Sequence, residues 1–305
     1  MKRFLICIAA LLPFVLGNAQ EITLVTRAEY SSVEDDHLGN SSFYALIDGD
    51  FTDNLSYSVS THLLSSSPAD LYKGTLHSNT GNWLDWANVT YDTGTFNFEI
   101  GKDMMQWGTM EMQEYDFDCY YDLTSYYWMN TVIYQWGASA GWTPTENSSL
   151  KVQMSTSPFG ERPFASGLYS YALFGSCQPT KWWEHIFSFN FVQTAPGEFL
   201  KFFNMGAKFT AGDFTFNWDS TTELHKGYCG SNMLYATWAP SENFSLQARA
   251  LCEQGLYEDG PDRIMGGAVL NWMPFEQLRL HALAAYDTYY GGLSYNFGVT
   301  WTISL

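Results

Sequence analysis

Apolar and polar residues alternate along most of the chain. From Leu293 to Leu305 every second residue is apolar, and the residues between them are Ser, Asn, Gly and Thr. A stretch that begins at Leu55 alternates in the same way with serines and a histidine. A period of two predicts β-strands. The C-terminal stretch exceeds the roughly 5–6 residues of a typical soluble strand and is long enough for the roughly 9–11 residues of a tilted membrane strand.

A Trp-x-Pro motif followed by Glu-Asn or Glu-Gln occurs three times. The copies begin at Trp142, Trp238 and Trp272, and an apolar row enters and leaves each one. Further short turns are predicted at residues 92–94 and 212–213, each followed by an aromatic-rich strand. Short turns preceded by an outward Trp predict a hairpin array with an aromatic girdle at a membrane interface. A soluble propeller is the alternative, but it would repeat about every 40–50 residues, whereas these copies are 96 and 34 residues apart.

Counting between the turn signals gives sixteen strands. They start near Glu21, Phe43, Asn54, Trp83, Thr95, Val132, Ser149, Leu168, Trp183, Lys201, Phe214, Asn232, Phe244, Ile264, Leu278 and Leu293. The pattern over residues 167–200 also permits a count of fourteen. A barrel of about 16–18 strands leaves an aqueous channel, whereas side chains fill a barrel of about eight. The predicted fold class is therefore all-β, a transmembrane antiparallel up-and-down β-barrel with alternating short and long connections.

The N-terminal residues have the composition of a secretory signal peptide. Lys2 and Arg3 precede an apolar run over residues 4–16, and small residues lie around Ala19. We expect cleavage after Ala19, which assigns residues 1–19 to the signal peptide and residues 20–305 to the barrel. A retained membrane anchor is the alternative, but the run is shorter than the roughly 20 residues that a spanning helix needs.

The composition narrows the classes of function. The chain has 305 residues and a formal net charge of -18, with 18% aromatic and 15% charged residues. Aromatic residues at this level exclude a disordered chain. A nucleic-acid partner is not expected, because contacts to phosphates need clusters of basic residues. The charged fraction is also low beside the roughly 25% of a soluble domain.

The alternating strands, the segment from Phe98 to Lys102 before a long connection, and the terminal Trp301-x-Ile303-x-Leu305 resemble bacterial outer-membrane porins. Within them the chain is most similar to porin-like barrels of Bacteroidetes, and distantly to the phosphate-selective porin family. This resemblance implies passive diffusion of small hydrophilic solutes through a barrel in the outer-membrane lipid, often as a homotrimer. Phosphate selectivity is not carried over, because the acidic chain favours neutral or cationic solutes.

Charged residues opposite the apolar rows are expected to face the lumen, because an Arg or Lys facing lipid at the midplane costs about 2–4 kcal/mol. The basic residues placed there are Arg27, Lys151, Lys208, Arg249 and Arg279, beside Gln135, Gln153, Gln247 and His281. The longest connection, residues 102–130, carries Asp103, Glu111, Glu114, Asp116, Asp118 and Asp122. In general porins the third loop folds into the lumen opposite a basic wall. The same arrangement here would filter ions by a transverse field, whereas a solvated or cation-binding extracellular loop is the alternative.

Signals for catalysis are weak. Residues 137–141 match the G-x-S-x-G pattern, but a nucleophile elbow needs a strand-to-helix turn and these residues lie within a predicted strand. We therefore predict no catalytic residue and no enzymatic activity. A barrel hydrolase and a structural or adhesive barrel remain as alternative functions.

Signals for metal ions or cofactors are also weak. The six histidines lack paired metal-binding spacing, and we predict no metal site and no cofactor. Asp48, Asp50 and Asp53 are interpreted as turn residues. The methionines of the long connection are expected to pack it against the wall, with soft-metal binding as the alternative; they are Met104, Met105, Met110 and Met112. Four cysteines follow the signal peptide, Cys119, Cys177, Cys229 and Cys252, and Cys119 could pair with Cys229 in an oxidising space.

Overall fold

The computed structural model describes residues 21–32, 42–65, 84–114, 123–131, 133–160, 162–224, 230–256, 262–289 and 291–305. These residues form the strands β1 (Glu21–Ser31), β2 (Ser42–Thr52), β3 (Leu55–Ser65), β4 (Leu84–Asp92), β5 (Phe96–Met104), β6 (Tyr134–Thr145), β7 (Ser148–Thr156), β8 (Tyr169–Thr180), β9 (Trp183–Ala195), β10 (Glu198–Ala211), β11 (Phe214–Glu223), β12 (Gly230–Ser241), β13 (Phe244–Gln254), β14 (Arg263–Phe275), β15 (Leu278–Asp287) and β16 (Gly292–Ser304). Among the described residues between β5 and β6, two short helices form, α3 (Met110–Glu114) and α5 (Tyr126–Asn130). No helix in these ranges is long and apolar enough to cross a membrane. The predicted cleavage site after Ala19 lies outside the described residues.

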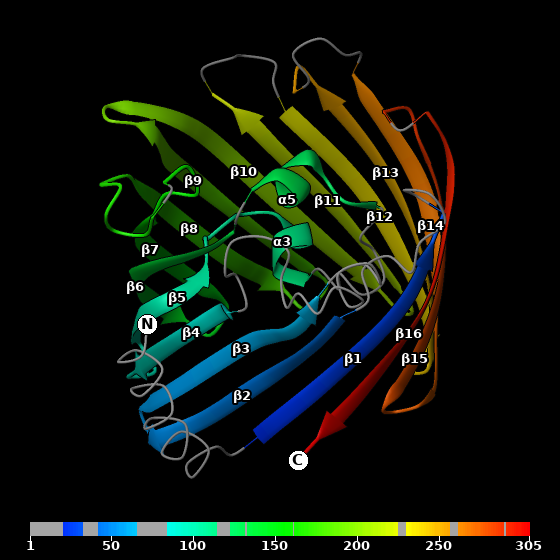
Figure 1. Ribbon diagram of the computed structural model, residues 1–305, viewed down its shortest axis with the longest axis horizontal. Coiled ribbons are helices and arrows are strands. Elements are labelled where there is room, and N and C mark those ends of the chain that lie inside the picture. The colour runs from blue at the N-terminus through cyan, green and yellow to red at the C-terminus, as the bar shows by residue number, and fades with distance from the viewer. Residues whose placement is uncertain are drawn as a thin grey trace.

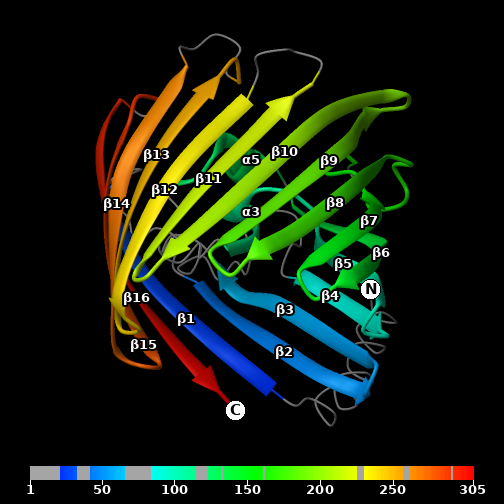
Figure 2. The ribbon, with the colours of Figure 1, turned by 180° about the vertical axis from the view of Figure 1, so that it is seen from behind.

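The described strands form one closed antiparallel barrel in which each strand pairs with its neighbours in sequence. The barrel closes between β1 and β16, where Val25 pairs with Thr302 and the backbones of Ile22 and Leu305 exchange hydrogen bonds. Closure leaves no sheet edge to pair with another chain. Figures 1 and 2 show the ring of strands from opposite sides. The prediction of sixteen strands is confirmed, and residues 167–200 form β8, β9 and the start of β10.

The Trp-x-Pro motif forms the same irregular hairpin end in all three copies. The register shifts just after each Trp, between Trp142 and Thr145 in the first copy, and at the corresponding residues in the other two. In the second copy Ala239 donates its N–H to the carbonyl of Asp213 in the neighbouring turn, at 2.9 Å. Proline has no N–H to offer the ladder, so it fits where the pairing is already interrupted.

The outward face of the barrel is apolar and exposed. On β16, Phe297 is 55% exposed, whereas the neighbouring inward Asn296 is 2% exposed. Exposed aromatic residues gather near the short turns, where the sequence predicted a girdle; they include Trp142, Trp182, Phe214, Trp238, Trp272, Phe275 and Trp301. The predicted outward rows are therefore confirmed.

The connection between β5 and β6 folds into the barrel. We call residues 105–133 the inserted loop, of which residues 105–114, 123–131 and 133 are described. Both of its helices lie inside the ring in Figures 1 and 2. The apolar residues of the loop pack in two clusters against inward residues of the wall. Met105, Met110 and Met112 are buried in these clusters and Met104 packs against one of them, which confirms the packing interpretation of the methionines.

The inner face of β8 to β15 is not polar throughout. Buried apolar side chains point inward from these strands, among them Ile186, Val192, Met233, Leu251 and Val269. They contact the apolar residues of the inserted loop. Contact between these apolar side chains and water would be unfavourable. Burial of each large apolar side chain stabilises the folded state by about 1.5–3 kcal/mol. The loop thus supplies a second apolar surface inside the barrel.

Candidate functional site: the lumen and its short-turn mouth

Three of the basic residues predicted to face the lumen lie beside a carboxylate on the inner wall. Lys151 Nζ is 3.4 Å from Glu99 Oε2 on β5, and Lys208 Nζ is 3.6 Å from Glu184 Oε2 on β9. Arg27 Nε is 3.6 Å from Oε2 of Glu29 on the same strand. These residues share the inward phase of the side chains that contact the inserted loop. Because each of these three basic residues has a carboxylate within 3.6 Å, its positive charge is largely compensated.

The other two predicted basic residues differ in their surroundings. Arg249 is 5% exposed, and its guanidinium lies 4.7 Å from the ring centroid of Tyr235. It donates to Gln247 Oε1 at 2.5 Å and to the carbonyl of Leu123 in the inserted loop at 3.2 Å. Arg249 thus holds the loop against the wall. Arg279 lies on β15, near the short-turn end, and is half-buried.

The acidic residues assigned to the long connection are distributed differently from the prediction. β5 extends through Met104, so Asp103 belongs to the wall. Glu111 is 3% exposed and accepts hydrogen bonds from the N–H of Ser125 at 2.9 Å and from its Oγ at 2.6 Å. Burial raises the pKa of the Glu111 carboxyl, and the nearby Arg249 opposes that shift. Glu111 therefore holds the two halves of the loop together.

Glu114 ends α3. Its side chain lies outside the described residues, as do the other acids of the predicted set, Asp116, Asp118 and Asp122.

The first arm of the inserted loop, residues 105–114, binds polar side chains of the wall. The N–H of Gln106 donates to Gln153 Oε1 on β7 at 2.9 Å, and Asn190 Nδ2 on β9 donates to the carbonyl of Gln106 at 2.8 Å. The N–H of Gly108 donates to Ser188 Oγ at 2.9 Å. Since these backbone groups are buried and have no strand partner, the wall residues supply the hydrogen bonds that burial demands.

The second described part of the inserted loop, residues 123–131, is the returning arm. It is held by a buried ion-pair cluster that the sequence analysis missed. Arg263 donates to Asp287 Oδ2 at 2.6 and 2.8 Å and to Glu253 Oε2 at 3.1 Å. Arg263 also donates to the carbonyl of Thr124, and Glu253 Oε1 accepts from the N–H of Tyr126 at 2.6 Å. Arg263 and Glu253 are at most 1% exposed. In the sequence, Glu253 and Arg263 lie at inward-facing positions of the alternating strands β13 and β14, and this alternation could have placed both in the lumen.

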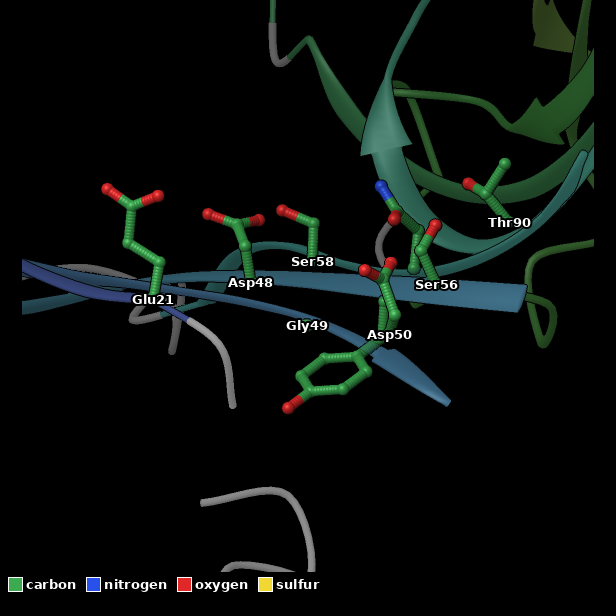
Figure 3. Close-up of a pocket in the computed structure, with 9 residues that line it drawn as sticks. Glu21, Asp48, Gly49, Asp50, Ser56, Ser58 and Thr90 are labelled. Carbon is green, nitrogen blue, oxygen red and sulfur yellow. The ribbon is translucent and has the colours of Figure 1, made fainter. Parts of the chain in front are cut away.

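A cavity of about 340 Å³ opens at the short-turn end of the inner wall, on β1 to β4. Glu21 pairs with Asp48, and Asp48 pairs with Ser58 on the next strand. Asp50 pairs with Ser56 in the adjacent row. Figure 3 shows the carboxylates and hydroxyls of these residues on one face of the sheet. All three acids are exposed, so this mouth presents three carboxylates to water.

The interpretation of Asp48, Asp50 and Asp53 as three turn residues is wrong for the first two. β2 continues through Thr52, which leaves Asp53 in the turn and places Asp48 and Asp50 on the inner wall. The strand continues because Ile47, Gly49 and Phe51 complete the alternation on the other face, a signal that was present in the sequence.

The remaining candidate chemistry has no assembled site. Residues 137–141 lie inside β6, without the strand-to-helix turn of a nucleophile elbow. Cys177 and Cys252 are free thiols, whereas Cys119 and Cys229 lie outside the described residues. Within the ranges that the structure describes, no three His, Cys, Asp or Glu side chains are grouped to hold a metal ion.

Comparison with known proteins identifies the fold. No protein-family model matches the chain, and no curated protein matches it in sequence. A mutant of the Rhodopseudomonas blastica porin superposes with a TM-score of 0.66 at 11% identity, over 92% of this chain and 99% of the porin. A loop-deletion form of OmpT, an outer membrane protein of Vibrio cholerae, superposes with a TM-score of 0.60 at 10% identity, over 94% of this chain and 100% of OmpT. The chain therefore has the barrel fold of these outer-membrane proteins.

Proposed function

We propose that this protein is an outer-membrane channel through which small hydrophilic solutes and ions diffuse passively. The observation that carries the proposal is a closed sixteen-stranded barrel with an exposed apolar outer face and a charged inner wall. A barrel of this strand number is wide enough for an aqueous path. The porin fold of the matched structures supports the same function. Export by a cleaved signal peptide and assembly as a homotrimer belong to the proposal.

The proposed channel favours cations. Lys151 and Lys208 of the wall lie beside carboxylates and Arg249 donates to a loop carbonyl. The carboxylates at the mouth, Glu21, Asp48 and Asp50, are exposed. Carboxylates along a pore concentrate cations and repel anions. Glu21 and Asp48 are also directly paired like charges, which destabilises a sheet. A function in attracting cations accounts for a pair that folding alone disfavours.

The inserted loop is the proposed constriction. It occupies part of the lumen and is fixed to the inner wall by buried hydrogen bonds. A contribution of Glu114, Asp116, Asp118 and Asp122 to the preference for cations stays part of this proposal. The proposal does not extend to phosphate selectivity, because the chain is acidic, or to a Bacteroidetes lineage, which the matched structures do not support.

Swelling of proteoliposomes tests passive diffusion. Vesicles that contain the purified protein are expected to swell in isotonic arabinose and more slowly in larger sugars, because the constriction admits solutes by size. Empty vesicles and vesicles with heat-unfolded protein are the controls. Vesicles that stay the same size in every sugar would contradict a diffusion channel and would favour a structural or adhesive barrel.

A further inference from the structure

We propose that Asp219 is a positioning residue of the channel: its carboxylate on β11 fixes α3 against the inner wall, above Gly206, and so sets the cross-section of the pore. This inference rests on the proposed channel function. It concerns a contact between the wall and the inserted loop that does not involve the carboxylates of the mouth.

The carboxylate of Asp219 binds the first two residues of α3. Its Oδ1 accepts from the N–H of Met110 at 2.6 Å, and its Oδ2 accepts from the N–H of Glu111 at 2.8 Å. The first N–H groups of a helix have no partner within the helix. A carboxylate that takes two of them holds the helix end in position and orientation. Tyr235 donates its hydroxyl to Oδ2 at 3.4 Å, which orients the carboxylate in turn.

Gly206 on β10 lies directly opposite Asp219 and leaves room for α3. A Cβ atom at Gly206 would lie 2.8 Å from the backbone nitrogen of Met110 and 2.8 Å from Asp219 Oδ1. The first is a backbone atom, and the second is a carboxylate oxygen that its hydrogen bond to α3 holds in place. Alanine would therefore push α3 away from the wall and toward the lumen.

The contact fixes one edge of the proposed pore. Asp219 is 4% exposed and Met110 is 1% exposed, so water does not separate the helix from the wall. The free side of the loop then bounds the aqueous path at a distance that this contact determines. A displacement of α3 by the width of a methyl group would narrow that path without a change of charge.

Two variants separate the position of the helix from the charge of the wall. Gly206→Ala blocks the close approach and leaves the charge unchanged. Asp219→Asn replaces one of the two accepting oxygens by an NH2 group, which donates and cannot accept. We expect amide hydrogen exchange in residues 109–114 to become about tenfold faster in both variants, as loss of a charged hydrogen bond implies. In planar bilayers, we expect Gly206→Ala to lower the single-channel conductance and the size limit for polyethylene glycols. Asp219→Asn should raise the open-channel noise.

Matched controls lie on the same sheet. Gly266→Ala adds a methyl group whose nearest neighbour is 3.7 Å away, and Asp213→Asn makes the same chemical change in the β10–β11 turn. Both should exchange and conduct like the wild type, and a resistance to SDS like that of the wild type identifies folded barrels. Unchanged amide exchange in both Gly206→Ala and Asp219→Asn would overturn the positioning role, and so would unchanged pore properties in both variants. The role would also be overturned if neither variant folded while both controls did. A wild-type protein that does not conduct would overturn the proposed function and with it the effect of Asp219 on a pore, whereas the exchange result would still report the contact itself.

Discussion

Replacing Arg263 by alanine is expected to lower the free energy of unfolding by about 3–5 kcal/mol, the usual cost of breaking a buried ion pair by removing one partner. The guanidinium contacts Glu253 Oε2 at 3.1 Å and Asp287 Oδ2 at 2.6 Å, and it also binds the carbonyl of Thr124. Without it, two carboxylates stay buried close together and a backbone carbonyl loses its donor. Urea titrations of the protein in lipid vesicles, followed by tryptophan fluorescence, measure the change.

Two further proteins decide whether the buried charges cause that loss. Arg162→Ala removes the same side chain from an exposed position between β7 and β8 and should change the free energy of unfolding by less than about 0.5 kcal/mol. A triple variant, Arg263→Met with Glu253→Gln and Asp287→Asn, should recover much of the stability because no charge is left unpaired. If Arg263→Ala and Arg162→Ala were equally stable, the cluster would not hold the returning arm of the loop.

Replacing Phe297 by arginine is expected to destabilise the folded protein in lipid by about 2–4 kcal/mol. Phe297 points outward, is 55% exposed, and lies four residues before Trp301 of the girdle. At about 3.3 Å per residue and a tilt near 40°, that places it about 10 Å from the girdle, close to the middle of an apolar band about 25 Å tall. An arginine there would face acyl chains.

The opposite face of β16 provides the control. Thr302→Arg puts the same residue on the inward face at the short-turn mouth and should cost less than about 1 kcal/mol, because water reaches the side chain. Phe297→Leu keeps an apolar side chain at the outward position and separates lost packing from buried charge. Equal stabilities for Phe297→Arg and Thr302→Arg would contradict the assignment of the two faces.

Alternation located the strands because the two faces of a barrel strand contact different surroundings. On β16 the inward residues are Ser, Asn, Gly and Thr and the outward residues are apolar, so a period of two is visible in the sequence. The closed order of the strands then followed from the short turns. This regularity explains why the strand number was predicted although no family model matches.

The inner surface could not be predicted as well, because the inserted loop is part of it. Val269 and Leu283 interrupt the alternation, and they share a buried cluster with Leu123 of the inserted loop, more than a hundred residues away in sequence. The sequence of the inserted loop has no regular alternation of apolar and polar residues from which its path could be predicted. Arg249 could be assigned to the lumen by phase, but its contact with the carbonyl of Leu123 depends on that path.

If a cation-preferring aqueous path runs through the barrel, the reversal potential of single channels in a KCl gradient will report it. We expect discrete conductance steps with a reversal potential of the sign set by potassium. The double variant Asp48→Asn and Asp50→Asn should shift that potential toward zero, because it removes two exposed charges from the mouth. A membrane without conductance steps, or a reversal potential of the sign set by chloride, would contradict the claim.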